Sequence, residues 1–413
     1  MKVKNRDLGA IEKVFWMLDQ VSQVHFAFAA EINTVCTEME WRTAIDATQL
    51  RHPLLSASIR GGDKVQPYFD FSGHVKIPVR WVESRNDDDK SWITEIETEL
   101  SAPFDWSLAP LIRIAIIGYK NRSVIVIAAH HCIADGVGMS LVIRDIVSAL
   151  AGQPLLPLPL PLSGDEHLKL LESVQSAGST EQQAMATSIE RREEVRPQVS
   201  QHVLSESVTQ EIINRVKSEG STVNATLSAA LVLAGRKLSE NWKDNKVRLV
   251  IPVSTRQALA IGEDCGLFIT KKTIGFESDE IDLWDMAKKV NAEIAQINTF
   301  EAIKEETKGL RQLLFSPMDI NDISNLLQSD VEREIMVSNI GRITFDTEIG
   351  KFKINALWGP IALSGSTGDQ TVGITTINGR MHFLHVSRMP IPGLLAAAVD
   401  MLKSLVATNK SHL

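Results

Sequence analysis

The chain has few of the features that mark secreted, membrane-spanning or nucleic-acid-binding proteins. It contains 3 cysteines in 413 residues, Cys36, Cys132 and Cys265, which are far apart. This odd number, without a Cys-x-x-Cys spacing, argues against a disulfide framework and fits a reducing compartment. No run of about 18 apolar residues, the length of a membrane-spanning helix, occurs in the sequence. Charges interrupt every apolar run near the N-terminus, so we expect no signal peptide and a cytoplasmic protein.

The chain also lacks an excess of basic residues. Its 51 acidic and 43 basic side chains give a net charge of -8. Nucleic-acid scaffolds need a basic stripe, so this balance argues against that class. With 44% hydrophobic residues and this length, the chain can form a large core and is expected to divide into two domains.

Apolar periodicity predicts mixed helices and strands of similar number in both halves, which indicates an α/β (α+β) fold. A Pro-rich stretch begins at 152, and a polar stretch follows it. We therefore predict a first lobe at 1–165, a linker at 166–200 and a second lobe at 201–413. The expected strands are 25–34, 111–120, 123–130, 200–207, 246–257, 267–276, 334–345, 352–362, 370–380 and 381–388. The expected helices are 8–20, 39–60 (ending near Pro53, before a short strand), 91–104, 138–152, 208–219, 224–238, 281–299, 318–329 and 391–407.

The segment HHCIADG, residues 130–136, follows the predicted strand 123–130 and precedes a predicted helix. Strand side chains alternate between faces, so His130 and His131 cannot share one face. One can point into a cleft and the other into the protein body. A neutral imidazole can accept a proton near pH 7 and would serve as a general base toward a hydroxyl or an amine. Asp135 fits a helix cap or a buried ion pair, and Gly136 lets the loop pass close to a substrate.

Other interpretations of these residues stay open. A histidine pair at a strand end can be a satisfied core or surface pair. A metal site is disfavoured because consecutive side chains diverge and no matching distant cluster occurs. Nucleophilic catalysis through Cys132 would need a lowered thiol pKa, which a sequence does not show.

The whole pattern His-His-x-x-x-Asp-Gly resembles the signature of an acyltransferase superfamily. Its members include chloramphenicol acetyltransferase, plant BAHD acyltransferases, wax ester synthases, nonribosomal peptide condensation domains and phthiocerol dimycocerosyl transferase-like proteins. The Asp-Phe-Gly-Trp-Gly motif of the plant enzymes is missing, which argues against that branch. Further segments similar to condensation-like members are RHPLLSASI (51–59), APFDWSLAPLIRIAII (102–117), IPVSTR (251–256), CGLFIT (265–270) and VSNIG (337–341).

The resemblance implies two chloramphenicol acetyltransferase-like lobes, each a mixed sheet with helices, and a tunnel between them. It implies that His131 takes a proton from the acceptor, which attacks an acyl thioester without an acyl-enzyme. His130, Asp135 and Gly136 are then structural supports of the site, and Arg256 is the expected partner of Asp135.

The same resemblance suggests residues of the tunnel wall, namely Ser338, Asn339 and Trp358. For Asn339 a simple turn role stays open, and for Trp358 core packing does.

The leading hypothesis is an acyltransferase that forms an ester from a thioester donor, either acyl-CoA or an acyl carrier protein, and a hydroxyl acceptor. The acceptor would be a small alcohol, amine or lipid-like molecule of secondary-metabolite or lipid biosynthesis. No cofactor and no metal is expected, and a monomer is expected. The alternatives are a stand-alone condensation enzyme that forms an amide and a non-catalytic binding protein of the same fold.

Overall fold

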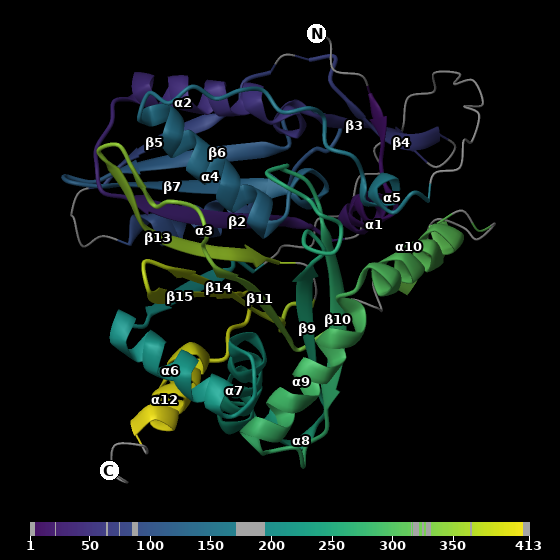
Figure 1. Cartoon of the computed structure of the whole chain (residues 1–413), viewed down its shortest axis with the longest axis vertical. Coiled ribbons are helices and arrows are strands. Elements are labelled where there is room, and N and C mark those ends of the chain that lie inside the picture. The colour runs from purple at the N-terminus through teal and green to yellow at the C-terminus, as the bar shows by residue number, and fades with distance from the viewer. Residues whose placement is uncertain are drawn as a thin grey trace.

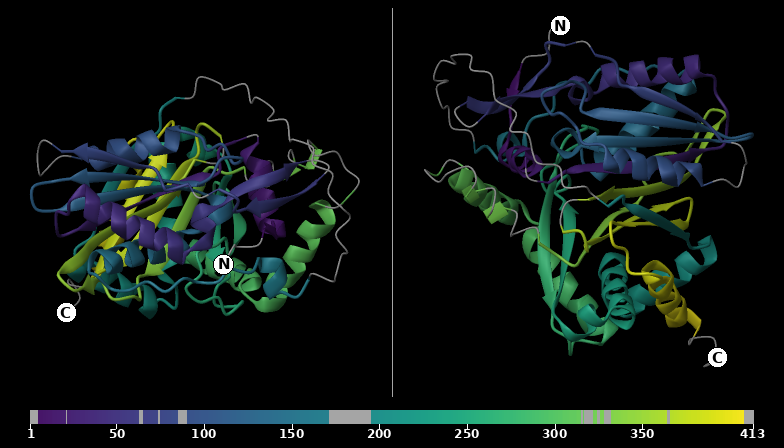
Figure 2. Two further views of the ribbon diagram at one scale, coloured as in Figure 1. Left: turned by 90° about the horizontal axis from the view of Figure 1, so that it is seen from above. Right: turned by 180° about the vertical axis from the view of Figure 1, so that it is seen from behind.

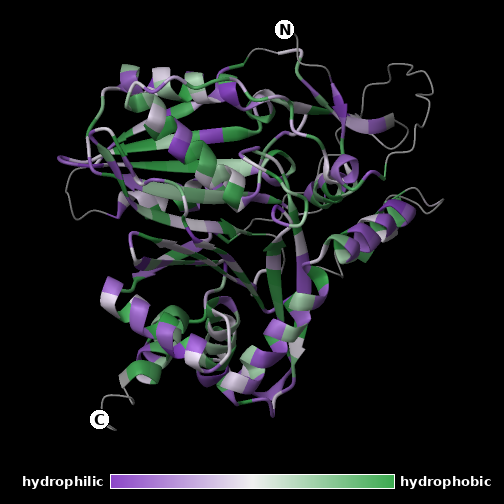
Figure 3. Cartoon of the chain, in the orientation of Figure 1, coloured by the Kyte–Doolittle hydropathy of each residue, from purple (hydrophilic) through white to green (hydrophobic). Residues whose placement is uncertain are grey.

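The chain folds into two lobes, each built around a six-stranded mixed sheet (Figures 1 and 2). Hydrophobic residues gather on the strands of both sheets and on the helix faces that cover them (Figure 3). The computed structural model describes residues 5–407, with gaps at 21, 63–64, 74, 85–89, 171–194, 315, 317–321, 324–325, 328–331 and 364–365.

The first lobe contains a sheet with the strand order β12-β13-β2-β7-β6-β5. Neighbouring strands are antiparallel except β6 and β5, which are parallel. β7 is buried along its whole length, as expected for a β-branched run at the centre of a sheet. The bounds are β2 (His25–Ile32), β5 (Val79–Glu83), β6 (Ile112–Gly118), β7 (Ser123–His130), β12 (Glu348–Ile349) and β13 (Phe352–Ala362).

Helices cover both faces of this sheet. Ile125 and Ile127 pack in the cluster formed with α1, α2 and α4, whereas Val124 and Val126 pack with α3 on the opposite face. This alternation follows from the two-residue period of a strand. The bounds are α1 (Ala10–Asp19), α2 (Glu38–Arg51), η1 (Pro53–Ser56), α3 (Ser91–Ser101), η2 (His131–Ile133), α4 (Gly136–Leu150) and α5 (Gly164–His167).

A small antiparallel sheet flanks the first lobe in the order β1-β4-β3. Its strands are β1 (Arg6–Asp7), β3 (Ser58–Gly62) and β4 (Val65–Asp70).

The second lobe contains a sheet with the order β10-β9-β11-β14-β15-β8, in which β9, β11 and β14 are parallel. Helices α6, α7, α9 and α12 form one hydrophobic cluster with this sheet. Its strands are β8 (Gln198–Val203), β9 (Val247–Ser254), β10 (Ile269–Phe276), β11 (Ile335–Arg342), β14 (Gln370–Ile377) and β15 (Arg380–Ser387). Its helices are α6 (Glu206–Ser218), α7 (Val223–Leu238), α8 (Glu240–Asp244), α9 (Leu283–Ile297), α10 (Phe300–Leu314) and α12 (Leu394–Ala407).

The two lobes share a strand. β13 comes from the second half of the sequence but pairs antiparallel with β2 of the first lobe. Its ladder shifts register between Trp358 and Ile361, where Gly359 has φ +109°. β14 lies against this irregularity, because a Cβ on Gly373 would stand only 2.3 Å from the carbonyl oxygen of Pro360. Small residues thus let two backbones of different sheets approach closely.

The two-lobed mixed α/β fold is confirmed, and most predicted elements are present within a few residues of the expected bounds. The sequence interpretation missed α10, β4 and β5. The proposed helix 318–329 lies mostly outside the described residues. The linker prediction at 166–200 also falls largely outside them, so the domain boundaries stay predictions. Within the described ranges, no helix is long and apolar enough to cross a membrane.

Candidate active site

Two side-chain caps shape the turn between β7 and α4. The Nδ1 atom of His130 accepts a hydrogen bond from the Cys132 backbone N–H at 3.2 Å and so caps the short helix η2. The Oδ1 atom of Asp135 accepts from the Gly138 backbone N–H at 2.6 Å and caps α4. Such caps satisfy backbone donors that a helix leaves unpaired at its start. The turn that carries His131 is therefore fixed at both ends.

The ring of His131 lies between two phenylalanine rings. It stacks on Phe26 of β2 with 4.4 Å between centroids and stands tilted against Phe15 of α1 at 4.9 Å. Its Nδ1 atom lies 3.2 Å from the carbonyl oxygen of Ala134. A carbonyl only accepts, so Nδ1 carries the proton and Nε2 keeps its lone pair in the neutral ring. Among the described residues, Nε2 has no hydrogen-bond partner, and the side chain is half-buried.

Burial sets the charge of His131. It lowers the pKa of this imidazole to about 3, although the hydrogen bond to Ala134 opposes the shift. The ring is therefore neutral near pH 7, and its Nε2 lone pair is available to a proton donor. The corresponding imidazolium would be a strong acid and would return its proton readily.

His130, the last residue of β7, has different surroundings from His131, which begins η2. It is fully buried, and its ring meets the edge of Phe104 with 6.3 Å between centroids. Its Nε2 atom lies 3.4 Å from an Asp19 carboxylate oxygen. His25 stands opposite His130 in the ladder of β2 and β7. The two adjacent histidines thus divide between a half-buried position and a closed interior.

Three other buried histidines make the fold sensitive to acid. Burial lowers the pKa values of His25, His382 and His385 to about 4, against an ordinary value of 6.5. Between these values the unfolded chain binds protons that the folded chain does not, so stability falls as the pH falls. Each histidine contributes up to about 1.4 kcal/mol per pH unit in this window.

The matched comparison is His385→Gln against the wild type, by urea unfolding at about pH 7.5 and about pH 5. The variant lacks one titrating ring, so we expect its acid-induced loss of stability to be smaller by about 2 kcal/mol. Equal losses in the two proteins would contradict the lowered pKa of His385.

Asp135 joins the two lobes. Both of its carboxylate oxygens lie within 3.1 Å of Nη2 of Arg256, and Oδ2 also accepts from the Phe268 backbone N–H at 3.0 Å. The Asp135 backbone N–H donates to the carbonyl of Gly266 at 3.0 Å. The carboxylate and the guanidinium are both buried. The structure thus places Arg256 against Asp135, the contact expected from the sequence.

A second ionic cluster connects the same loop of the second lobe to α2 and α4. Glu263 receives hydrogen bonds from Arg51 and Arg144, each at 2.6 Å. Both arginines also bind Asp145, as does the ring of His52 at 2.8 Å. Arg51 of RHPLL therefore anchors the loop 255–268 beside the His-His turn, and His52 binds the same Asp145 carboxylate as Arg51.

Gly136 allows a close approach of the second half of the chain. A Cβ at this position would lie 2.6 Å from Cγ of Pro360 and 3.0 Å from Cγ2 of Ile340. We expect Gly136→Ala to destabilise the protein by about 1–3 kcal/mol, because overpacking forces neighbours to shift. Gly164→Ala is the matched control, since it also begins a helix but has no atom within 4 Å. Thermal and urea unfolding measure both variants, and equal stabilities would contradict this packing.

The other predicted site residues lie in β11 and β13. Ser338 and Asn339 are half-buried, and the Asn339 Oδ1 atom accepts from the Gly341 backbone N–H at 2.8 Å. Trp358 is buried between Trp92 at 5.2 Å and His382 at 4.8 Å. The Asn339 hydrogen bond lies at the irregularity of β11, where the register with β14 shifts, and the Trp358 contacts are those of a packed core residue. The place of these residues in a tunnel wall stays a prediction.

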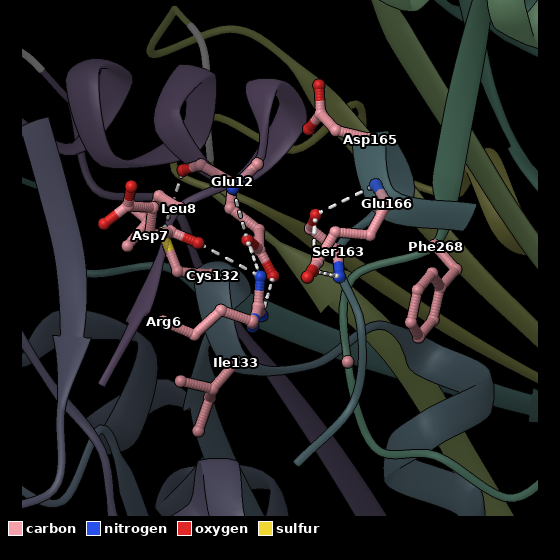
Figure 4. Close-up of polar contacts among 12 residues, drawn as sticks. Arg6, Asp7, Leu8, Glu12, Cys132, Ile133, Ser163, Asp165, Glu166 and Phe268 are labelled. Atoms are coloured by element: carbon pink, nitrogen blue, oxygen red, sulfur yellow. Dashed lines mark hydrogen bonds and ion pairs between the residues drawn. The ribbon is translucent and has the colours of Figure 1, made fainter. Parts of the chain in front are cut away.

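A cluster of polar contacts formed by Arg6, Glu12, Cys132 and Asp165 holds α1 beside the turn (Figure 4). The Cys132 thiol donates to the carbonyl of Glu12 at 3.2 Å, and the Glu12 carboxylate binds Arg6 at 2.7 Å. Asp165 of α5 accepts from the Ala10 backbone N–H at 2.5 Å. Burial raises the pKa of the Cys132 thiol well above its ordinary value, so this thiol is a poor nucleophile.

A cavity opens beside this cluster of polar contacts, between α1 and α5 on one side and β10 and α10 on the other. Its wall is mostly apolar, and His131 is not part of it. The lining residues are Ile11, Gly164, Asp165, Leu168, Thr255, Leu259, Leu267, Phe268, Ile269, Thr270, Ile303, Glu306, Thr307 and Leu310. The expected tunnel to His131 stays a prediction.

Two family models match consecutive parts of the chain. The condensation domain model matches residues 15–161, and the model of the phthiocerol/phthiodiolone dimycocerosyl transferase C-terminus matches residues 193–347. The chain belongs to the chloramphenicol acetyltransferase-like superfamily. The superfamily resemblance expected from the His-His-x-x-x-Asp-Gly segment is thereby confirmed.

Solved structures agree with this superfamily fold over almost the whole chain. The first condensation domain of the CDA synthetase has a TM-score of 0.69 at 12% identity, covering 98% of this chain and 97% of that one. Polyketide synthase associated protein 5 from Mycobacterium tuberculosis has a TM-score of 0.66 at 18% identity, covering 97% of each chain.

Curated relatives of this superfamily member are far longer proteins. Tyrocidine synthase 3 from Brevibacillus parabrevis is 33% identical over 116 residues, which are 28% of this chain and 2% of that protein. Nonribosomal peptide synthetase NPS2 from Ceriporiopsis subvermispora is 23% identical over 160 residues, which are 38% of this chain and 6% of that protein. The chain thus spans only a small part of the length of these curated relatives. The two family models support a transferase and leave the bond that it forms undetermined.

Proposed function

We propose that the protein transfers an acyl group from a thioester to a hydroxyl acceptor, with His131 as the general base. The observation that carries the proposal is the fixed tautomer of His131, because the Ala134 carbonyl holds the proton on Nδ1 and the Nε2 lone pair has no partner among the described residues. A neutral base beside an acceptor is what proton removal from a hydroxyl requires.

The proposed reaction balances without a covalent enzyme intermediate. Nε2 of His131 takes the hydroxyl proton while the oxygen attacks the thioester carbonyl carbon. The C–S bond then breaks, and the imidazolium returns the proton to the leaving thiolate. The low pKa of His131 favours this return and makes the first step depend on close positioning of the acceptor.

An ester product is favoured by the match of residues 193–347 to a transferase C-terminal model. The donor is an acyl-CoA or an acyl chain on a carrier protein. The test is incubation of the protein with labelled acyl groups on each carrier, together with panels of alcohols and amines. We expect ester formation with at least one alcohol. Amide formation alone, from carrier-bound donors alone, would refute the ester proposal.

The second candidate is an amide-forming condensation enzyme, which the condensation domain match at 15–161 favours. The same panel tests it through the amine acceptors. Tight binding of an acyl thioester without turnover of any acceptor would instead indicate a non-catalytic protein of this fold.

A further inference from the structure

His130 holds its proton on one particular nitrogen. Its Nδ1 atom accepts the Cys132 backbone N–H at 3.2 Å, and an atom that accepts a hydrogen bond carries no proton. In the neutral ring the proton is therefore on Nε2. The opposite arrangement would place two N–H groups against each other and break the cap of η2.

The surroundings of Nε2 match this tautomer. This nitrogen is fully buried and makes no hydrogen bond to the described residues, but it lies at ion-pair distance, 3.4 Å, from Oδ2 of Asp19. The Asp19 side chain is only 9% exposed. His25, opposite His130 in the ladder, donates from Nε2 to the Glu99 carbonyl and so presents a lone pair at Nδ1. Oδ2 of Asp19 is therefore the acceptor that faces the Nε2–H group.

Asp19 is itself held in place. It is the last residue of α1, and its Oδ1 atom accepts the Val24 backbone N–H at 3.1 Å. With one oxygen bound to Val24, the other must face the His130 ring. A carboxylate at this position presents an acceptor on both sides, which no other side chain of this length does.

We propose that Asp19 is a positioning residue that keeps the proton of His130 on Nε2 and thereby sets the turn that carries His131. The path is short: Asp19 orients the His130 ring, Nδ1 caps η2 at Cys132, and η2 begins at His131. The inference rests on the proposed function only where it predicts an effect on acyl transfer. The tautomer and the ring position are properties of the protein alone.

Asp19→Asn tests the proposal with an almost unchanged shape. The amide oxygen of Asn must face the Val24 N–H, so its NH₂ group must face Nε2 of His130. Two donors would then meet, and we expect the proton of His130 to move to Nδ1 and the Cys132 cap to open.

The primary measurement is the ¹H–¹⁵N correlation spectrum of the histidine rings in the full chain, with hydrogen exchange of the Cys132 amide. Asp105→Asn is the control, since Asp105 also accepts a backbone N–H two residues on, in an exposed loop. We expect a changed His130 tautomer, shifted His131 ring signals and faster Cys132 exchange in Asp19→Asn alone. An unchanged tautomer in Asp19→Asn would overturn the proposal.

The catalytic consequence is read separately. We expect kcat of Asp19→Asn to fall about 10- to 100-fold with KM nearly unchanged, by analogy with the loss of hydrogen-bond partners of metal-bound histidines. A changed tautomer with unmoved His131 signals would overturn the link to His131. If His131→Ala were fully active, the proposed function would fail, whereas the His130 and His131 spectra would still decide the role of Asp19.

Discussion

Replacing His131 with alanine is expected to lower kcat for acyl transfer by about 10²- to 10⁴-fold, the usual contribution of a positioned general base. The variant removes the Nε2 lone pair proposed to take the proton and leaves both caps of the turn, at His130 and Asp135, in place. The measurement is the initial rate with the best donor and acceptor of the panel, together with thermal unfolding to show that the fold is retained.

His202→Ala is the matched control for this experiment, because His202 lies on β8 in the second lobe, where it pairs in the ladder with Phe383. We expect its rate to equal that of the wild type. A His131→Ala protein as active as this control would remove His131 as the base.

Replacing Arg256 with alanine is expected to lower the free energy of unfolding by about 3–5 kcal/mol, because it leaves the buried carboxylate of Asp135 without its counter-charge. Asp135 would keep its hydrogen bonds from Gly138 and Phe268, which do not neutralise the charge. Urea unfolding near pH 7 measures the change.

Arg60→Ala is the control for a pair of the same chemistry at the surface. Arg60 is 49% exposed and lies 3.5 Å from Asp70, so we expect a loss below about 1 kcal/mol. Adding Asp135→Asn to Arg256→Ala should restore part of the lost stability, since it removes the unpaired charge. Equal losses for Arg256→Ala and Arg60→Ala would contradict the buried pairing.

Elements with strong local signals could be predicted from the sequence. β6 and β7 are β-branched runs separated by a short turn, and β14 and β15 flank the turn formed by Asn378 and Gly379. The different directions of His130 and His131 were expected from strand alternation, but His131 lies past the end of β7, in η2. These predictions succeed because the spacing of the apolar residues, the turn residues and the burial of the side chains all indicate the same strands within a short stretch of sequence.

The contacts that complete the site could not be predicted, because they join distant segments. Phe15 and Phe26 enclose His131 from α1 and β2, while Pro360 reaches Gly136 from β13. Nothing in the β13 segment indicates that it leaves the second lobe for the first sheet. The polar, strongly amphipathic helix α10 was missed because its apolar positions are few.

The ionic supports of the site are also long-range contacts. Asp19 meets His130 across 111 residues by their numbering, and Glu263 reaches Arg51 from the other lobe at 2.6 Å. Asp19 lies at the end of α1, where a local hydrogen bond to the Val24 backbone already explains a carboxylate. The sequence therefore does not indicate its second contact, with His130.

The most direct test of the central claim is the protonation state of His131, observed by ¹⁵N spectra of the imidazole rings as the pH is lowered from about 8 to about 5. We predict that the ring stays neutral throughout, with its proton on Nδ1 and none on Nε2, since burial lowers the pKa to about 3. A titration near the ordinary value of 6.5, or a proton on Nε2, would contradict the account.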